Sequence, residues 1–322
     1  MLEASPPVGA TATGRRMGGT TAYVVALVAS VFAILSQYFL PQSVPALDPV
    51  YGSFFGDLFV VYGVPILAFA LLVGSRPLAG FVENTGRAVV QGLAWYGVLS
   101  LVALVVLIGL TIVYLAVDPS ALSQLTKETP VIQNAKSDPW FWVVFSFIIG
   151  LVEELIFRGW VFGYWLVRSP NRWVAHATWT SALFAGVHLY YGQTYGSVAP
   201  LVIPPLFFLG FAFAAAVRAS GGNLIVVGIL HGVNDAVAFY SLVNPNSAVA
   251  IHYLIVLLGG AIGLALYLRG RPAPAPAGPW SGSGAPPYGV PADPYRLLPP
   301  PDWVPPPPTP APPPPPVGPP PG

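Results

Sequence analysis

The chain has 322 residues, of which 55% are hydrophobic, 13% aromatic and only 8% charged. Soluble globular domains carry about 25% charged residues, so this composition, with a mean hydropathy of +0.68, excludes an ordinary soluble domain. The formal net charge of +1 provides no basic surface for a phosphate backbone, and we expect no nucleic-acid partner. The chain contains no cysteine, which excludes disulfides and thiolate chemistry.

Eight apolar stretches are long enough to cross a hydrocarbon core about 30 Å thick at about 1.5 Å per residue. They predict an all-α, polytopic membrane helix bundle with about eight transmembrane helices. The predicted membrane domain spans residues 19–269, after a short N-terminal segment of residues 1–18. The eight stretches lie at residues 20–40, 52–74, 91–117, 139–167, 173–190, 198–217, 223–243 and 248–268.

Arginines mark every second connection between these stretches. They are Arg15 and Arg16, Arg76 and Arg87, Arg168 and Arg172, Arg218, and Arg269 and Arg271. The opposite connections hold only Lys127 and Lys136, both in the longest of them. Because cytoplasmic loops carry the excess of Lys and Arg, this pattern places the N- and C-termini in the cytoplasm. The Ala- and Gly-rich, cysteine-free composition favours a bacterial plasma membrane.

Most of the 39 prolines follow residue 269, with runs at residues 305–308 and 312–316. Such a composition cannot form a packed core, so residues 270–322 are predicted to be a disordered, extended cytoplasmic tail. The tail is expected to be solvated, with a proline-recognising partner as the alternative.

Three ionisable residues, Glu153, Glu154 and Arg158, lie within one apolar stretch. Charges at membrane depth are costly, so they need either partners or a function. Glu154 and Arg158 are four residues apart in the favourable order and can neutralise each other. Glu153 has no such partner on its helix, and a carboxylate held in this way suits general-base catalysis.

Further polar residues are predicted at a similar depth on other helices. Counted along each helix from its arginine, Glu153, His188 and His231 all lie roughly 20–24 Å deep at the rise of an α-helix, if the residues after Arg218 are helical. Asn234 and Asp235 follow His231 at three and four residues, on nearly the same helical face. We therefore expect these residues to share one layer near the middle of the membrane.

Three motifs in order, Glu153-Glu154-x-x-x-Arg158, Phe184-x-x-x-His188 and His231-x-x-x-Asp235, give the chain a family resemblance. It resembles the CPBP family of intramembrane proteases, the CAAX-protease and bacteriocin-processing or Abi family. The resemblance covers residues 139–243 well. It implies an intramembrane endopeptidase that cleaves a membrane-associated substrate, which can be lipidated. The substrate is open between prenylated proteins, peptide maturation, signalling and bacteriocin immunity.

The resemblance also implies roles for individual residues. Glu153 and His188 would activate a water, and His231 and Asp235 would stabilise the oxyanion. Glu154 and Arg158 would fix the helix and tune Glu153, while Phe184 would pack or contact substrate. The position of Asp235 is commonly Asn in this family, and an ionised Asp cannot donate a hydrogen bond. Asp235 could instead be protonated, orient His231, or leave the donor role to Asn234.

Metal use is a separate question, since the family is often described as metalloproteases. Glu153, His188, His231 and Asp235 could supply nitrogen and oxygen ligands to zinc. No His-Glu-x-x-His helix is present and the ligands would come from three helices, so we favour metal-free water activation, with no cofactor required.

Two other function classes fit the same buried polar residues. A proton-coupled secondary transporter uses carboxylates and histidines at this depth, but we find no repeat symmetry. A non-catalytic immunity or scaffold protein would not need the intact set of Glu153, His188 and His231. His176 and His252 are expected to be packing or interfacial residues, and Asp57 is expected to meet water or a helix dipole.

Overall fold

The computed structural model describes residues 18–44, 53–119, 135–189 and 195–269, together with residues 46, 50, 133 and 191. All regular secondary structure within these ranges is helical, with no strand, as the sequence predicts. The predicted proline-rich tail at residues 270–322 and the predicted N-terminal segment, apart from Gly18, lie outside the described residues.

The described residues form eight long helical runs, one at each stretch predicted from the sequence, although several extend beyond the predicted bounds; α5, for example, begins at Thr85 rather than at residue 91. Three runs contain a π-helical segment and therefore carry more than one label. Short 3₁₀ segments, η5 (Pro170–Arg172) and η6 (Gly196–Val198), lead into α10 and α12, and η3 (Arg76–Leu78) lies between α4 and α5. The runs are α1 (Thr20–Ser43); α3 (Phe54–Leu58), η2 (Phe59–Gly63) and α4 (Val64–Leu72); α5 (Thr85–Val117); α8 (Pro139–Glu154), η4 (Leu155–Phe162) and α9 (Gly163–Arg168); α10 (Trp173–Val187); α12 (Ala199–Ser220); α13 (Ile225–Tyr240); and α14 (Pro245–Leu254), η7 (Ile255–Gly259) and α15 (Gly260–Arg269).

Six of these runs are long and apolar enough to cross a membrane by themselves, which makes this an integral membrane protein. The other two, α10 and α13, have 15 and 16 residues and are shorter than the predicted spans. The shortening of α13 has a local cause. Gly221 and Gly222 have φ of 80° and 108°, a region that favours glycine, so α12 ends at Ser220 and α13 begins only at Ile225. The depth count for His231 assumed a continuous helix here and was wrong.

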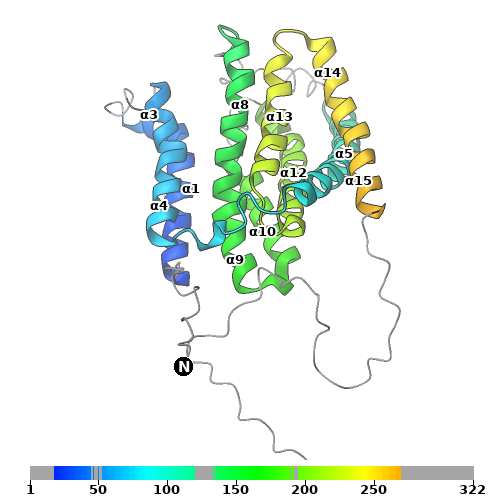
Figure 1. The fold of residues 1–322 in the computed structure, drawn as a ribbon. Coiled ribbons are helices and arrows are strands. Elements are labelled where there is room, and N and C mark those ends of the chain that lie inside the picture. Colours follow the sequence, from blue (N-terminus) through cyan, green and yellow to red (C-terminus); the bar gives the residue numbers. More distant parts are fainter. Residues whose placement is uncertain are drawn as a thin grey trace, which may run out of the picture.

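The runs pack as neighbouring pairs around the middle of the bundle (Figure 1). Helix α8 packs on α13, α12 packs on both α5 and α10, and α15 packs on α5. Helices α1, α3 and α4 form a separate layer on one side of α8 (Figure 1), with fewer contacts to the rest through η4 and α10.

Glycines bring α8 and α13 into close contact. A Cβ built on Gly232 would lie 2.6 Å from Cα of Phe147, and one on Gly228 would lie 2.8 Å from Cα of Leu151. On α8, a Cβ on Gly150 would meet the backbone nitrogen of Gly232 at 2.5 Å. Small residues four apart allow helix backbones to approach in this way within a membrane. Gly228 and Gly232 flank His231, so the close approach also carries that side chain toward α8.

The arginines of alternate connections gather at one end of the bundle, which we call the arginine end. It comprises Arg76, Arg87, Arg168, Arg172, Arg218 and Arg269. Hydrogen bonds tie its connections together: Arg168 Nη2 donates to the Gly18 carbonyl at 3.1 Å, and Asn223 Nδ2 donates to the Glu83 carbonyl at 2.8 Å. The end of α8 that begins at Pro139 lies at the opposite face, at the top of Figure 1.

Candidate active site

Glu153 and Glu154 are the last two residues of helix α8, and the π-helix η4 begins immediately after them. Asp138 caps the start of this run by accepting a hydrogen bond from the Phe141 amide at 3.0 Å, with Pro139 at the first helical position. Short π-helical segments inside α-helices occur often at functional sites. Here the segment follows directly after Glu153 and Glu154.

The imidazole of His231 lies between these two glutamates. Its Nδ1 is 2.8 Å from Glu154 Oε1, and its Nε2 is 3.6 Å from Glu153 Oε2. Asp235 Oδ2 lies 3.5 Å from the same Nε2. Because a carboxylate only accepts hydrogen bonds, Nδ1 carries a proton and donates a hydrogen bond to Glu154. The side chains predicted to share one layer from α8 and α13 therefore meet in the structure.

Glu154 and Arg158 form the predicted pair, with Arg158 Nη1 donating to Glu154 Oε1 at 2.8 Å. Both side chains are enclosed, at 0% and 2% exposure. The guanidinium lies over the Phe184 ring, 4.3 Å from its centroid, which gives the buried cation a second favourable contact. The same Glu154 oxygen accepts from both Arg158 and His231, so Glu154 holds His231 as well as balancing Arg158.

Glu153 has a partner that the sequence did not indicate. Tyr62 Oη, from η2, donates to Glu153 Oε1 at 3.0 Å. The expectation that Glu153 lacks a partner holds only for its own helix, because the hydrogen bond comes from a layer with no recognisable motif. Glu153 keeps 13% exposure, whereas its neighbour Glu154 is fully enclosed. Glu153 is therefore the glutamate that can reach a substrate.

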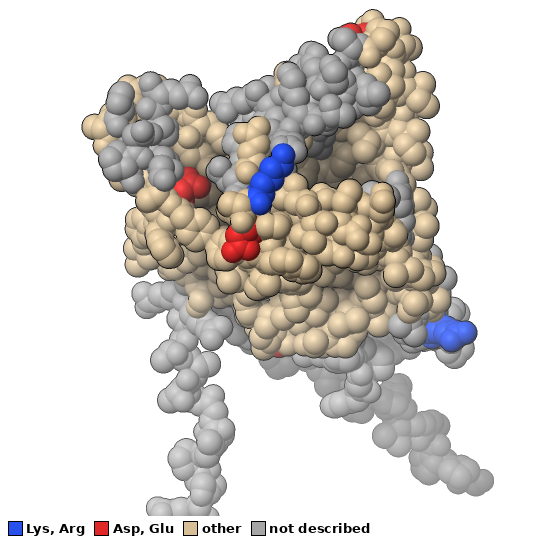
Figure 2. Space-filling model, turned by 90° about the horizontal axis from the view of Figure 1, so that it is seen from above, with Lys and Arg blue, Asp and Glu red and all other residues tan. Residues whose placement is uncertain are grey.

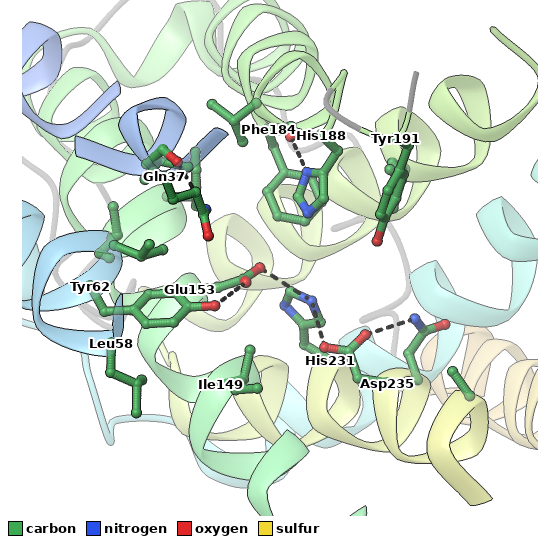
Figure 3. Close-up of a pocket in the computed structure, with 18 of the residues that line it drawn as sticks. Gln37, Leu58, Tyr62, Ile149, Glu153, Phe184, His188, Tyr191, His231 and Asp235 are labelled. Atoms are coloured by element: carbon green, nitrogen blue, oxygen red, sulfur yellow. Dashed lines mark hydrogen bonds and ion pairs between the residues drawn. The ribbon is translucent and has the colours of Figure 1, made fainter. Parts of the chain in front are cut away.

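His188 follows the last residue of α10 and faces the same space as Glu153 (Figure 3). Its Nδ1 lies 2.7 Å from the Phe184 carbonyl oxygen, which can only accept, so this nitrogen also carries a proton. In the neutral ring Nε2 then holds the lone pair. The Phe184 ring packs against both histidines, with centroids 4.9 Å from His188 and 5.8 Å from His231. Phe184 therefore contacts both imidazoles.

Asp235 and Asn234 extend this network along α13. Asn234 Nδ2 donates to Asp235 Oδ1 at 3.3 Å, and Tyr96 Oη on α5 donates to Asn234 Oδ1 at 3.3 Å. Asp235 keeps 27% exposure. One hydrogen of the Asn234 amide is therefore already used to hold Asp235, whose other oxygen faces His231.

The site opens into a cavity of about 460 Å³. Figure 3 shows Glu153, His231 and Asp235 on one side, with Tyr62, His188 and Tyr191 around them. Its walls come from α1, α3, η2, α8, η4, α10, α12 and α13, and most of them are apolar or aromatic. A concave, mostly apolar space with a few convergent polar groups is the usual form of a binding site.

Three further polar residues, Asp57, His176 and His252, lie outside the motifs and differ in their relation to the cavity. Asp57 lies in the first turn of α3, as expected for a residue near a helix start, but it also lines the cavity. His176 is a packing residue: it stacks on Trp165 at 5.6 Å, and its Nε2 lies 2.7 Å from Ser169 Oγ. His252 lies on α14, away from the cavity lining.

Zinc ligation was the alternative use for Glu153, His188, His231 and Asp235. Within the described part of the chain, no group of three or more His, Cys, Asp or Glu side chains is arranged so that it could hold a metal ion. His231 also spends Nδ1 on Glu154, which leaves only Nε2 for any ligand. Zinc binding stays a prediction.

Residues 135–237 match a family model described as Type II CAAX prenyl endopeptidase Rce1-like. The matched segment contains all three motifs and every side chain of the network except Tyr62 and Tyr96. It confirms the resemblance to CAAX-type proteases, and it points to a protease rather than a transporter or scaffold. No curated protein and no solved structure matches this chain.

Proposed function

With residues 135–237 matching the Rce1-like family, we propose that this protein is an intramembrane endopeptidase in which Glu153 activates the attacking water. One observation carries the proposal. Glu153 is held by Tyr62 from one side and lies beside His231 on the other, inside a cavity within the membrane bundle. A general base must be fixed within reach of the proton it removes, and this carboxylate is fixed from two helices.

In the proposed reaction Glu153 takes a proton from a water that attacks the scissile carbonyl. The same carboxyl group then gives the proton to the leaving amine as the peptide bond breaks. His188 contributes its Nε2 lone pair on the opposite side of the cavity, where it can accept a hydrogen bond from the water and direct it.

His231 is the candidate donor to the oxyanion. Both of its nitrogens lie against carboxylate oxygens, and of the three carboxylates around it only Glu154 is paired with the guanidinium of Arg158, so a doubly protonated ring fits this setting. Such a ring donates through Nε2 to the negative charge that forms on the carbonyl oxygen. Because Asn234 already donates to Asp235, the orienting role is the best supported for Asp235, which would hold His231 in place.

The substrate class follows from the position of the site. The cavity lies among helices that span the membrane and its walls are largely apolar or aromatic, so the substrate is a peptide segment anchored in or next to the bilayer. A lipid attached to the substrate would fit the same walls. The proposal requires no metal.

The test is Glu153→Gln in the full-length protein. We expect cleavage of a membrane-anchored substrate, found by comparing membrane peptides from cells with parent and variant, to fall about 10²- to 10⁴-fold, the usual contribution of a general base. Glutamine keeps the shape and can still accept from Tyr62, so the thermal unfolding midpoint should change little. Glu83→Gln, an exposed glutamate at the arginine end, is the matched control.

Retained cleavage by Glu153→Gln would sink the mechanism. A chelator arm separates the metal question from it: activity that is lost on chelation and returns with added zinc would make the site metal-dependent, while the need for Glu153 would stand.

A further inference from the structure

The cavity lies toward one face of the bundle, opposite the arginine end. On α8 its lining runs from Trp142 to Glu153, in the half of the run Pro139–Arg168 that begins at Pro139, and on η4 it includes only Ile156 and Phe157, just past the middle of that run. On α13 it runs from His231 to Phe239, in the last two-thirds of a helix that starts at the arginine end. The contributions of α1, α3, η2 and α10 likewise come from the halves of those runs remote from the arginines: Ile34, Gln37, Tyr38, Phe54, Asp57, Leu58, Val61, Tyr62, Phe184 and Val187.

Aromatic rings surround the part of the cavity farthest from the arginines. Phe54 on α3 meets Trp142 at 6.0 Å and Phe145 at 5.3 Å on α8, and Trp142 meets Phe239 on α13 at 5.4 Å. These pairs join three helices at the same level. Rings with this placement are typical of the interface between membrane and water. The cavity therefore extends from the buried network toward that interface.

The arginine end and the opposite face of the bundle differ in their number of basic residues. Six of the seven arginines that the structure describes lie at the arginine end, and Arg158 is inside the bundle. At the opposite face the described charges outside the cavity are Lys136 with Asp118 and Asp138, and charged side chains are few when this face is viewed from above (Figure 2). Under the positive-inside rule, the arginine end lies in the cytoplasm and the face toward which the cavity extends lies outside it.

Acidic side chains outnumber basic ones in the cavity lining. Three carboxylates, Asp57, Glu153 and Asp235, line the cavity, and neither Lys nor Arg is found among the described lining residues. The imidazole of His231 also lines it, and its Nε2 already faces Glu153 and Asp235. Acidic groups in a mostly apolar space repel acidic ligands and attract basic ones. A substrate carboxylate would find no Lys or Arg among the described lining residues, and the ring of His231 is already flanked by the carboxylates of Glu153 and Asp235.

We propose that the cavity is entered from the non-cytoplasmic face of the membrane, and that it takes an apolar or basic peptide segment that lacks acidic residues near the scissile bond. The candidate substrates are peptides exposed outside the cytoplasm and still anchored in the bilayer. Cleavage of such segments rests on the proposed function. The side of entry rests only on the cavity and the arginines.

The absence of cysteine allows a direct test, because a single introduced thiol is the only one in the protein. Ala238→Cys and Leu58→Cys report from two walls of the cavity, on α13 and α3. Asn171→Cys is an exposed control at the arginine end, and Asn246→Cys is an exposed control at the opposite face. Each full-length variant is treated with a membrane-impermeant sulfonated maleimide, in right-side-out spheroplasts and in inverted vesicles of a bacterial host.

We expect the thiols at 58, 238 and 246 to react in spheroplasts, and the thiol at 171 to react only in inverted vesicles. Reaction of the cavity thiols only in inverted vesicles would overturn the proposal, as would reversal of the two controls. Cavity thiols that react only after denaturation would also overturn it, because the cavity would then be closed to both aqueous phases. None of these results depends on proteolytic activity.

A second arm tests the substrate class in cells. Single-span reporters carry the same apolar segment at the membrane surface, either outside or inside the cytoplasm, with two flanking lysines or two flanking glutamates. We expect cleavage of the outside, lysine-flanked reporter at least tenfold above the other three, and its loss with Glu153→Gln. Preferred cleavage of an inside or glutamate-flanked reporter would overturn the inference while leaving the proposed function intact. If no reporter is cut although the thiol result holds, the proposed function and the substrate class fail while the side of entry stands.

Discussion

Two walls of the cavity are built in different ways. The wall of α8 and α13 is joined by glycine contacts and carries Glu153, Glu154, His231 and Asp235 in a continuous network. The wall of α1, α3 and η2 lies outside the family match and contributes to the network the hydrogen bond from Tyr62 to Glu153. The closely packed pair of α8 and α13 therefore positions most side chains of the network, while the facing layer adds a hydrogen bond to one of them, Glu153.

The first way to break this comparison is to separate α8 from α13. Gly232→Ala adds a Cβ that would lie 2.6 Å from Cα of Phe147, so the helices must move apart. A displacement of about 1 Å at a catalytic group can cost about 10²-fold in rate, and we expect at least this loss of cleavage together with a lower unfolding midpoint.

Gly109→Ala is the matched control, because a Cβ at Gly109 meets no atom within 4 Å. Its activity and stability should equal those of the parent. Parent-like activity of Gly232→Ala would show that close packing of the two helices is not needed.

The second prediction concerns the charge balance inside the same wall. Arg158→Met removes the cation beside Glu154 and leaves a fully enclosed carboxylate with His231 alone. Breaking one side of a buried ion pair costs about 3–5 kcal/mol, so we expect a clear loss of folded protein in detergent, measured by thermal unfolding.

Glu154→Gln combined with Arg158→Met should recover part of this stability, because no unbalanced charge then stays at that position. Arg172→Met, at an exposed connection of the arginine end, should have little effect. If Arg158→Met were as stable as the parent, the pair would not be a structural requirement.

The third prediction tests the orienting role of Asp235. Asp235→Asn keeps the shape but removes one of the carboxylates that face Nε2 of His231. Hydrogen bonds to charged groups are worth about 1.5–3 kcal/mol, so we expect cleavage to fall about ten- to hundredfold with the fold intact. An increase in activity would instead show that this position serves best as a hydrogen-bond donor.

The smallest effect is expected on the facing wall. Tyr62→Phe removes only the hydroxyl that donates to Glu153 Oε1, and a hydrogen bond typically contributes about 0.5–1.5 kcal/mol net, or roughly a three- to tenfold loss of turnover. Tyr114→Phe on α5, outside the cavity, is the control. A loss as large as that of Glu153→Gln would mean that the facing wall also takes part in the chemistry.

Much of this arrangement could be predicted from the sequence. Buried charges are rare in membrane helices, so Glu153, Glu154 and Arg158 could be recognised, and the four-residue spacing correctly predicted the Glu154–Arg158 pair. The apolar stretches predicted the eight helical runs, and the alternation of arginines predicted the end at which each begins. These signals are local, or are set by the spacing along a single helix.

The rest depends on contacts between distant parts of the chain. The bond from Tyr62 to Glu153 joins residues 91 positions apart, and a tyrosine in an apolar stretch resembles any interfacial aromatic residue. The hydrogen bond between Glu154 and His231 was not predicted, because Arg158 was already expected to neutralise the carboxylate of Glu154. The Gly-x-x-x-Gly spacing around His231 was present in the sequence and could have indicated the close approach of α13.

The Glu154–Arg158 pair also has a consequence for how the protein is made. Both partners lie on one helical run, one turn apart, so their bond can form as soon as that segment is synthesised and coils. His231 is 77 residues further along the chain and arrives later. The segment can therefore leave the translocation machinery with Glu154 already neutralised. The contacts of Glu153 with Tyr62 and His231 form only when the other helices pack against this segment.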